Sequence, residues 1–80
     1  MAKGIHDQRY RDLMSALKSA RKAKGLNQTE VARALGSRQQ FVSKYETGER
    51  RLDAVEFLDV AAILGLDGIA ILKSILDTRS

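Results

Sequence analysis

Hydrogen-bonding side chains are concentrated in one short stretch of the chain: Arg38, Gln39, Gln40, Ser43 and Lys44. Glutamine can form two hydrogen bonds with an adenine edge, and arginine and lysine pair with guanine or with phosphate. Val42 and Tyr45 lie at helical spacing among them, so we expect the polar set to form the outer face of a short helix. Such a helix can enter the major groove of DNA and read base edges.

A second short helix is expected just before this one, because Val31 and Leu35 lie four residues apart and share a face. Gly36 then interrupts the pattern where a sharp turn needs a positive φ, which glycine adopts at little cost. We expect Ser37 to cap the following helix, with Gln40 closing a capping box. Two helices joined by a glycine-containing turn predict a helix-turn-helix.

The composition limits what else the chain can be. Its 80 residues predict one small domain spanning 1–80, and 44% hydrophobic residues with no proline favour a helical globular fold. The chain has no cysteine and no cluster of metal-ligating residues, so we expect neither a disulfide, a metal nor another cofactor. The net charge of +4 favours a polyanionic partner, although this charge is common on other proteins too. No apolar run resembles a signal peptide or a membrane span, which predicts a cytoplasmic protein.

Hydrophobic periodicity and capping signals predict an all-α fold, a compact bundle of five helices. We expect these helices at about residues 7–24, 27–35, 38–46, 53–64 and 66–80, with capping boxes opening the second and the fourth. The buried face of the fourth helix is predicted to comprise Phe57, Leu58, Ala61 and Leu64.

Residues 17–66 closely resemble the phage repressor and Cro-like (xenobiotic-response-element type) helix-turn-helix family, which has a lambda-repressor-like fold. The resemblance is carried by the run from Arg21 to Gln28 and by Val31, Ala32, Leu35, Gly36, Val42, Ser43, Glu46, Gly48, Leu58, Ala61, Leu64 and Gly65. Leu52 and Phe41 depart from the pattern, because the family often has proline and a small polar residue at these positions.

The resemblance implies a DNA-contacting set comprising Asn27, Gln28, Arg38, Gln39, Gln40, Phe41, Ser43, Lys44, Arg50 and Arg51. Gln28 would bond a phosphate at a helix N-terminus, Gln39 would read a base, and the loop arginines would grip phosphate. The alternative for each of these residues is a solvated side chain, and Gln40 is also expected to act in capping. Arg21 and Glu46 would form a partly buried ion pair that orients the reading helix without contacting DNA.

The last predicted helix carries more apolar residues than one buried stripe requires. Ile69, Leu72 and Leu76 define one face, while Ile71 and Ile75 lie on another. If one face closes the core, the other is a candidate dimer interface; the alternative is that both faces are core.

These patterns predict a sequence-specific DNA-binding transcriptional regulator, a repressor that binds a palindromic operator in double-stranded DNA as a homodimer. No room for an effector domain is expected in so short a chain. The alternative is an antitoxin-like or coactivator-like protein-interaction module on the same fold. Phe41, an apolar residue on the otherwise polar face of the third helix, favours this alternative. No nucleophile–base arrangement is visible, so an enzyme is not expected. His6 is expected to be solvated, and Asp7 and Asp12 to lie in the first turn of a helix.

Overall fold

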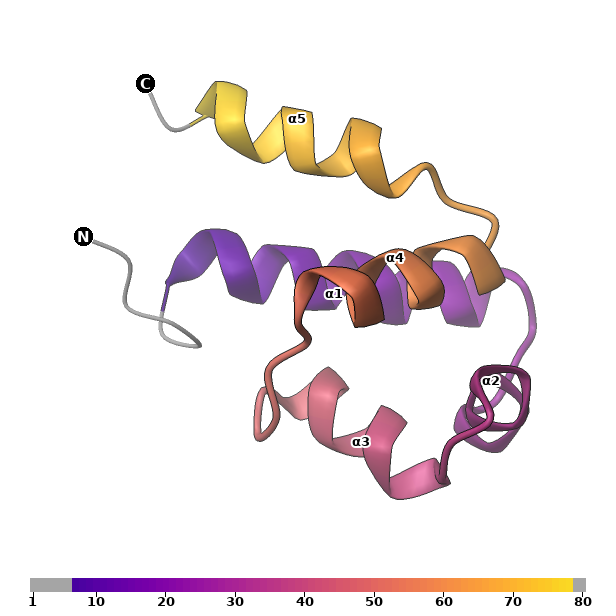
Figure 1. Ribbon diagram of the computed structural model, residues 1–80. Coiled ribbons are helices and arrows are strands. Elements are labelled where there is room, and N and C mark those ends of the chain that lie inside the picture. The colour runs from indigo at the N-terminus through magenta and orange to yellow at the C-terminus, as the bar shows by residue number, and fades with distance from the viewer. Residues whose placement is uncertain (1–6, 79–80) are drawn as a thin grey trace.

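The computed structural model describes residues 7–78, which form five α-helices and no strand. The helices are α1 (Gln8–Ala23), α2 (Gln28–Leu35), α3 (Gln39–Thr47), α4 (Ala54–Ile63) and α5 (Gly68–Thr78) (Figure 1). The predicted all-α fold with five helices is confirmed. His6 lies outside the described residues, and no helix within 7–78 is long and apolar enough to cross a bilayer.

Polar residues cap the N-termini of α1, α2 and α4 through short local hydrogen bonds. Asn27 and Glu30 form a reciprocal capping box at α2, and Asp53 and Glu56 form another at α4, as the sequence predicted. Asp7 is the N-cap of α1 and accepts a hydrogen bond from the Arg9 N–H, so it precedes the first turn in which it was expected. These carboxyl and amide groups satisfy helix N–H groups that have no partner within the helix.

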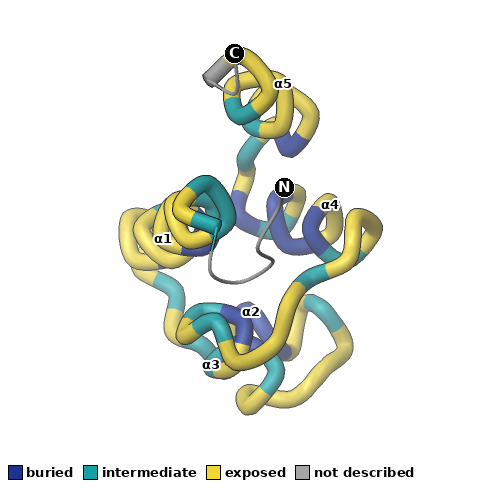
Figure 2. The backbone as a smooth tube through the Cα atoms, turned by 90° about the vertical axis from the view of Figure 1, so that its left-hand side faces the viewer, coloured by how far each residue is buried: buried dark blue, intermediate teal, exposed yellow. Residues whose placement is uncertain are grey.

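The hydrophobic core lies between α1, α2, α3 and α4 (Figure 2). It consists of Met14, Leu17, Val31, Ala32, Val42, Tyr45, Phe57, Val60, Ala61 and Leu64. The prediction for Leu58 is wrong: its side chain is 39% exposed, and Val60 is fully buried instead. The buried positions of α4 follow the helical spacing of Phe57, Val60, Ala61 and Leu64, and position 58 lies outside that stripe.

Helix α5 lies across α1 and α4 on the opposite side of the molecule from α3 (Figures 1 and 2). It packs against α4 at Gly68, where an added Cβ would lie 2.9 Å from Leu58 Cδ2 and 3.3 Å from Phe57. The absence of a side chain at position 68 therefore permits this packing.

The two apolar faces of α5 take different environments. Ile71 and Ile75 are half-buried, and Ile71 packs against the core. Ile69 and Leu76 are 59% and 58% exposed, and Leu72 is also exposed. Ile71 therefore contributes to the core, whereas Ile69, Leu72 and Leu76 form the more exposed apolar face of α5. The dimer interface expected among Ile69, Ile71, Leu72, Ile75 and Leu76 stays a prediction.

Candidate nucleic-acid interface

The turn between α2 and α3 is closed by glycine. Gly36 has φ 69°, in the left-handed region that glycine adopts at least cost, and its N–H donates to the Arg33 carbonyl. The next N–H, of Ser37, donates to the Ala32 carbonyl at 2.9 Å. These bonds end α2 and reverse the chain, while Val42 enters the core from α3. The result is the predicted helix-turn-helix.

The predicted cap of α3 is wrong. Its N-cap is Arg38, not Ser37, and no side chain caps the helix by a hydrogen bond. Ser37 is drawn into the end of α2 through its N–H, so α3 begins later, where the Phe41 N–H donates to the Arg38 carbonyl at 2.9 Å. Consequently Gln40 is not engaged in a capping box and stays exposed.

The outward side of α3 is polar and open to solvent. Arg38, Gln39, Gln40 and Lys44 are exposed, and Ser43 is half-buried. Among residues 7–78, the side chains of Arg38, Gln40 and Lys44 find no hydrogen-bond or ion-pair partner. Their donors and acceptors are therefore free for an external ligand.

Gln39 belongs to a chain of hydrogen bonds that joins α1, α2 and α3. Its Nε2 donates to Gln28 Oε1 at 2.5 Å, and Gln28 Nε2 donates to Glu46 Oε1 at 2.9 Å. Glu46 also accepts from Arg21 Nε at 2.7 Å and from Arg21 Nη2 at 3.1 Å. Arg21 Nη1 donates to the Leu26 carbonyl at 2.8 Å. Gln39 is thus held in one orientation, and its carbonyl oxygen and second amide hydrogen have no partner within residues 7–78.

Arg21 and Glu46 form the ion pair that the resemblance implied. Their side chains are 9% and 2% exposed, so water screens the pair very little. The hydrogen bond to Glu46 raises the pKa of Arg21 above its usual value, which keeps the guanidinium charged. Burial raises the pKa of the neighbouring Tyr45 to about 12, so this phenol stays neutral.

Asn27 and Gln28 lie together at the start of α2. Asn27 Oδ1 accepts from the Glu30 N–H at 2.8 Å, and the Asn27 N–H donates to Glu30 Oε1 at 2.8 Å. Capping therefore uses the carbonyl side of the Asn27 amide, and the residue itself stays exposed. Gln28, at the start of α2, belongs to the same hydrogen-bond network as Gln39. The start of α2 and the first turn of α3, both predicted to contact DNA, therefore lie side by side.

Arg50 has an intramolecular partner that the sequence did not reveal. Its Nη1 and Nη2 donate to the two oxygens of Glu56 at 3.0 and 2.9 Å, and its guanidinium lies 4.8 Å from the centre of the Phe41 ring. This pairing raises the pKa of Arg50 and lowers the pKa of Glu56. Phe41 in turn packs edge-on against Tyr45. Arg50 therefore fastens the loop after α3 to the start of α4.

The sequence did not predict the contact between Arg51 and Tyr10. Arg51 is exposed, with its guanidinium carbon 5.3 Å from the centre of the Tyr10 ring. The Tyr10 hydroxyl accepts from the Leu52 N–H at 3.0 Å, so α1 holds this loop in place. Helical periodicity assigns Tyr10 to an apolar face and cannot reveal that its hydroxyl reaches a loop so distant in sequence. Arg51 is left as the loop arginine without a carboxylate partner in the described range.

The fold and the exposed polar face of α3 define a DNA-binding domain of the helix-turn-helix class. A sequence model of the helix-turn-helix family matches residues 17–69. The chain is also similar to a solved structure, an XRE-family like protein from Pseudomonas syringae pv. tomato str. DC3000. The two share 44% identity and a TM-score of 0.86, over 98% of this chain and 95% of that chain. Comparison with curated proteins found no match. The chain belongs to the XRE-type helix-turn-helix family of DNA-binding transcriptional regulators.

Proposed function

We propose that the protein is a repressor that binds a palindromic operator as a homodimer, with α3 in the major groove. The observation that carries this proposal is the Gln39–Gln28–Glu46–Arg21 chain of hydrogen bonds, which fixes a base-reading amide at the first turn of α3. A glutamine amide fixed in this way matches the acceptor and donor of an adenine edge. Phosphate contacts from Gln28 at the start of α2 and from Arg51 would position that amide.

The other exposed side chains of α3 supply further contacts. Gln40 and Ser43 can reach base edges, whereas Arg38 and Lys44 can reach guanine or the adjoining phosphate. Arg50 contributes by positioning the loop, since Glu56 already occupies its guanidinium. Asn27 adds its free amide hydrogens beside Gln28.

The homodimer is proposed to form through the exposed apolar face of α5, which comprises Ile69, Leu72 and Leu76. Apolar side chains at helical spacing on an exposed helix favour a protein partner. In a two-fold dimer, both subunits bury the same face against each other. A dimer that reads two half-sites needs its recognition helices about 34–36 Å apart, one turn of duplex DNA. Ile75 lies at the inner edge of this face and Ile71 supports it from the core.

The alternative, a protein-interaction module that docks through α3, loses its main support in the structure. Phe41 was the apolar residue of α3 that favoured it. Its ring is half-buried, with Tyr45 on one side and Arg50 over its face. The ring therefore has internal partners, and the open part of α3 is polar.

Selection of bound duplexes from a random DNA pool tests the proposal and supplies the operator. The expected result is an inverted repeat with half-site centres about 10 base pairs apart. Gln39→Ala is expected to relax preference at one position of each half-site, at a cost of about 1–3 kcal/mol there. Equal losses on selected and scrambled duplexes would contradict base reading by Gln39. Placing the selected site over a reporter promoter then separates repression from activation.

Ile69→Lys tests the dimer face, with Ala70→Lys as the matched control on the exposed polar side of the same helix. The first variant is expected to remain folded and to sediment as a monomer with weakened operator binding. The control is expected to behave like the wild-type chain. A wild-type chain that binds a single half-site as tightly as the full palindrome would contradict the dimer.

A further inference from the structure

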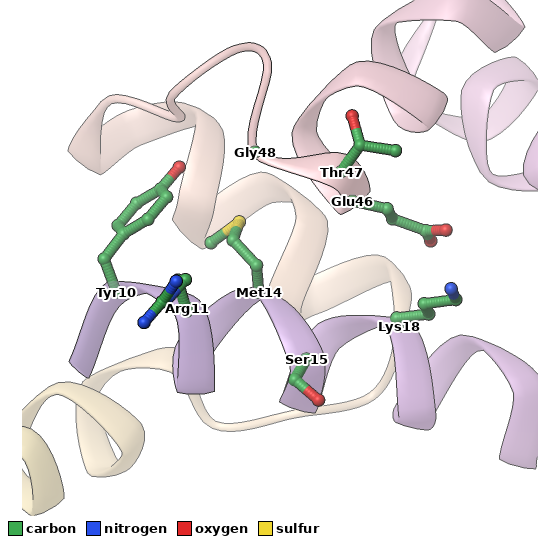
Figure 3. A pocket seen from close by; sticks show the side chains of 8 residues that line it. All are labelled: Tyr10, Arg11, Met14, Ser15, Lys18, Glu46, Thr47 and Gly48. Atoms are coloured by element: carbon green, nitrogen blue, oxygen red, sulfur yellow. The ribbon is translucent and has the colours of Figure 1, made fainter. Parts of the chain in front are cut away.

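A hollow of about 410 Å³ lies between α1 and the last turn of α3 (Figure 3). Arg11, Ser15 and Lys18 line it from α1, and Glu46 and Thr47 line it from α3. No residue predicted to contact DNA lines this hollow.

The hollow continues the base-reading side of α3. Gln39, Ser43 and Thr47 follow one another at four-residue steps, which places them on the same side of the helix. Glu46, in the wall of the hollow, is the carboxylate that receives the Gln28 amide. A duplex that meets Gln39 therefore passes the mouth of the hollow at the other end of α3.

The charges of the hollow favour an anion. Arg11 and Lys18 form no ion pair within residues 7–78. Arg11 donates to a neutral partner, the Gln8 amide, at 2.8 Å, and the hydroxyl of Ser15 has no hydrogen-bond partner in the same range. Glu46 is the one acidic wall residue, and its charge is compensated by Arg21 at 2.7 Å. Two uncompensated cations and one free hydroxyl thus line the α1 side of the hollow.

We propose that this hollow binds a phosphate of the DNA backbone, with Lys18 and Arg11 supplying charge and Ser15 donating a hydrogen bond. The proposal rests on the DNA binding proposed for α3. A phosphate held here would anchor the C-terminal end of α3, while the start of α2 anchors the region around Gln39. Contacts of this kind fix the orientation of a reading helix and carry no sequence information.

Charge-neutral variants test the proposal. Lys18→Gln and Arg11→Gln each remove one cation, and Lys73→Gln is the matched control, because Lys73 is exposed on α5, across the molecule from α3. Affinities are measured by fluorescence anisotropy on the selected duplex and on a scrambled duplex, between about 50 and about 200 mM salt. Lys18→Gln removes one phosphate contact from each protomer of the proposed homodimer. It is therefore expected to weaken both complexes alike and to reduce the slope of log K against log salt by about 1.8. The affinity lost over that salt range then shrinks about 12-fold. The control is expected to leave affinity and slope unchanged.

Methylphosphonate substitution identifies the phosphate. Each phosphate of the selected duplex is replaced in turn by the uncharged group, and the effect is measured on the wild-type chain and on Lys18→Gln. One position in each half-site is expected to weaken the wild-type complex and to have no further effect on the variant. If every methylphosphonate weakens the wild-type complex and the Lys18→Gln complex by the same factor, the proposal is overturned.

A structural role for Lys18 gives a different pattern, because a cation near the end of α3 also offsets the helix dipole. In that case Lys18→Gln lowers the melting temperature and leaves the salt slope unchanged, which overturns the phosphate site alone. Failure of the wild-type chain to bind either duplex would overturn the proposed function and this site together.

Discussion

Arg21→Met tests whether the buried ion pair holds α3 in place. Methionine fills much of the same space, so the main loss is electrostatic. Glu46, with a side chain 2% exposed, would keep only the donor from Gln28, and the Leu26 carbonyl would lose its donor at 2.8 Å. Breaking one side of a buried pair costs about 3–5 kcal/mol, and the orphaned carbonyl adds about 1 kcal/mol.

This loss is large for a domain of 80 residues, whose free energy of unfolding is expected at about 4–12 kcal/mol. Even the lower figure of about 3 kcal/mol lowers the melting temperature by about 12–24 °C. Urea unfolding followed by circular dichroism gives the free energy directly. DNA affinity is expected to fall as well, although the Arg21 side chain is directed to Glu46 and Leu26.

The double variant Arg21→Met/Glu46→Gln supplies the control. It removes the unpaired charge, and an amide carbonyl at position 46 can still accept from Gln28. We expect it to recover about 2 kcal/mol or more relative to Arg21→Met alone. If the double variant is as unstable as the single one, the loss does not come from an unpaired carboxylate, and the reasoning is refuted.

Three further perturbations follow from the fold. Leu17→Ala empties a fully buried site in α1 and is expected to cost about 2–5 kcal/mol in urea unfolding; a loss below about 1 kcal/mol would show that the site collapses. Gly36→Ala meets no atom within 4 Å but forces a methyl group onto φ 69°, so thermal melting should show a loss of about 1–2 kcal/mol, and Gly36→Asn a smaller one. The hydrogen bond from Arg9 lowers the pKa of Asp7 from 3.8 to about 2, and the hydrogen bond from Arg50 lowers the pKa of Glu56. These folded pKa values lie below the unfolded ones, so the stabilisation is complete above about pH 5 and is lost as the pH falls toward about 2. The free energy of unfolding of Asp7→Asn, measured against pH, is expected to fall less in acid than that of the wild-type chain. The same acid dependence in both chains would contradict a contribution from Asp7.

Local signals in the sequence were sufficient for the helices and most of their ends. The boxes at Asn27 and Asp53 could be predicted because capping depends on residues three positions apart. The helix-turn-helix followed from apolar spacing around Gly36. Ser37 was misassigned, because its N–H can close α2 only when Gly36 takes a positive φ, and a capping pattern does not include that competition.

The errors and omissions concern contacts between elements. Helical periodicity gave Ile71 and Ile69 different faces of α5, but the side that meets the core depends on how Gly68 seats the helix on α4. The pairing of Arg50 with Glu56 crosses a loop, and the bond from Gln39 to Gln28 crosses a turn. Neither has a repeating pattern that periodicity could reveal.

If α3 reads DNA as proposed, its three unpartnered side chains separate the choice of DNA sequence from the integrity of the fold. Arg38, Gln40 and Lys44 project from a helix whose position is set by Val42 in the core and by the buried ion pair. Exchanging an exposed residue that has no partner usually changes stability by no more than about 0.5 kcal/mol. Gene duplication followed by substitution at these positions can therefore yield regulators for new operators without any intermediate that fails to fold.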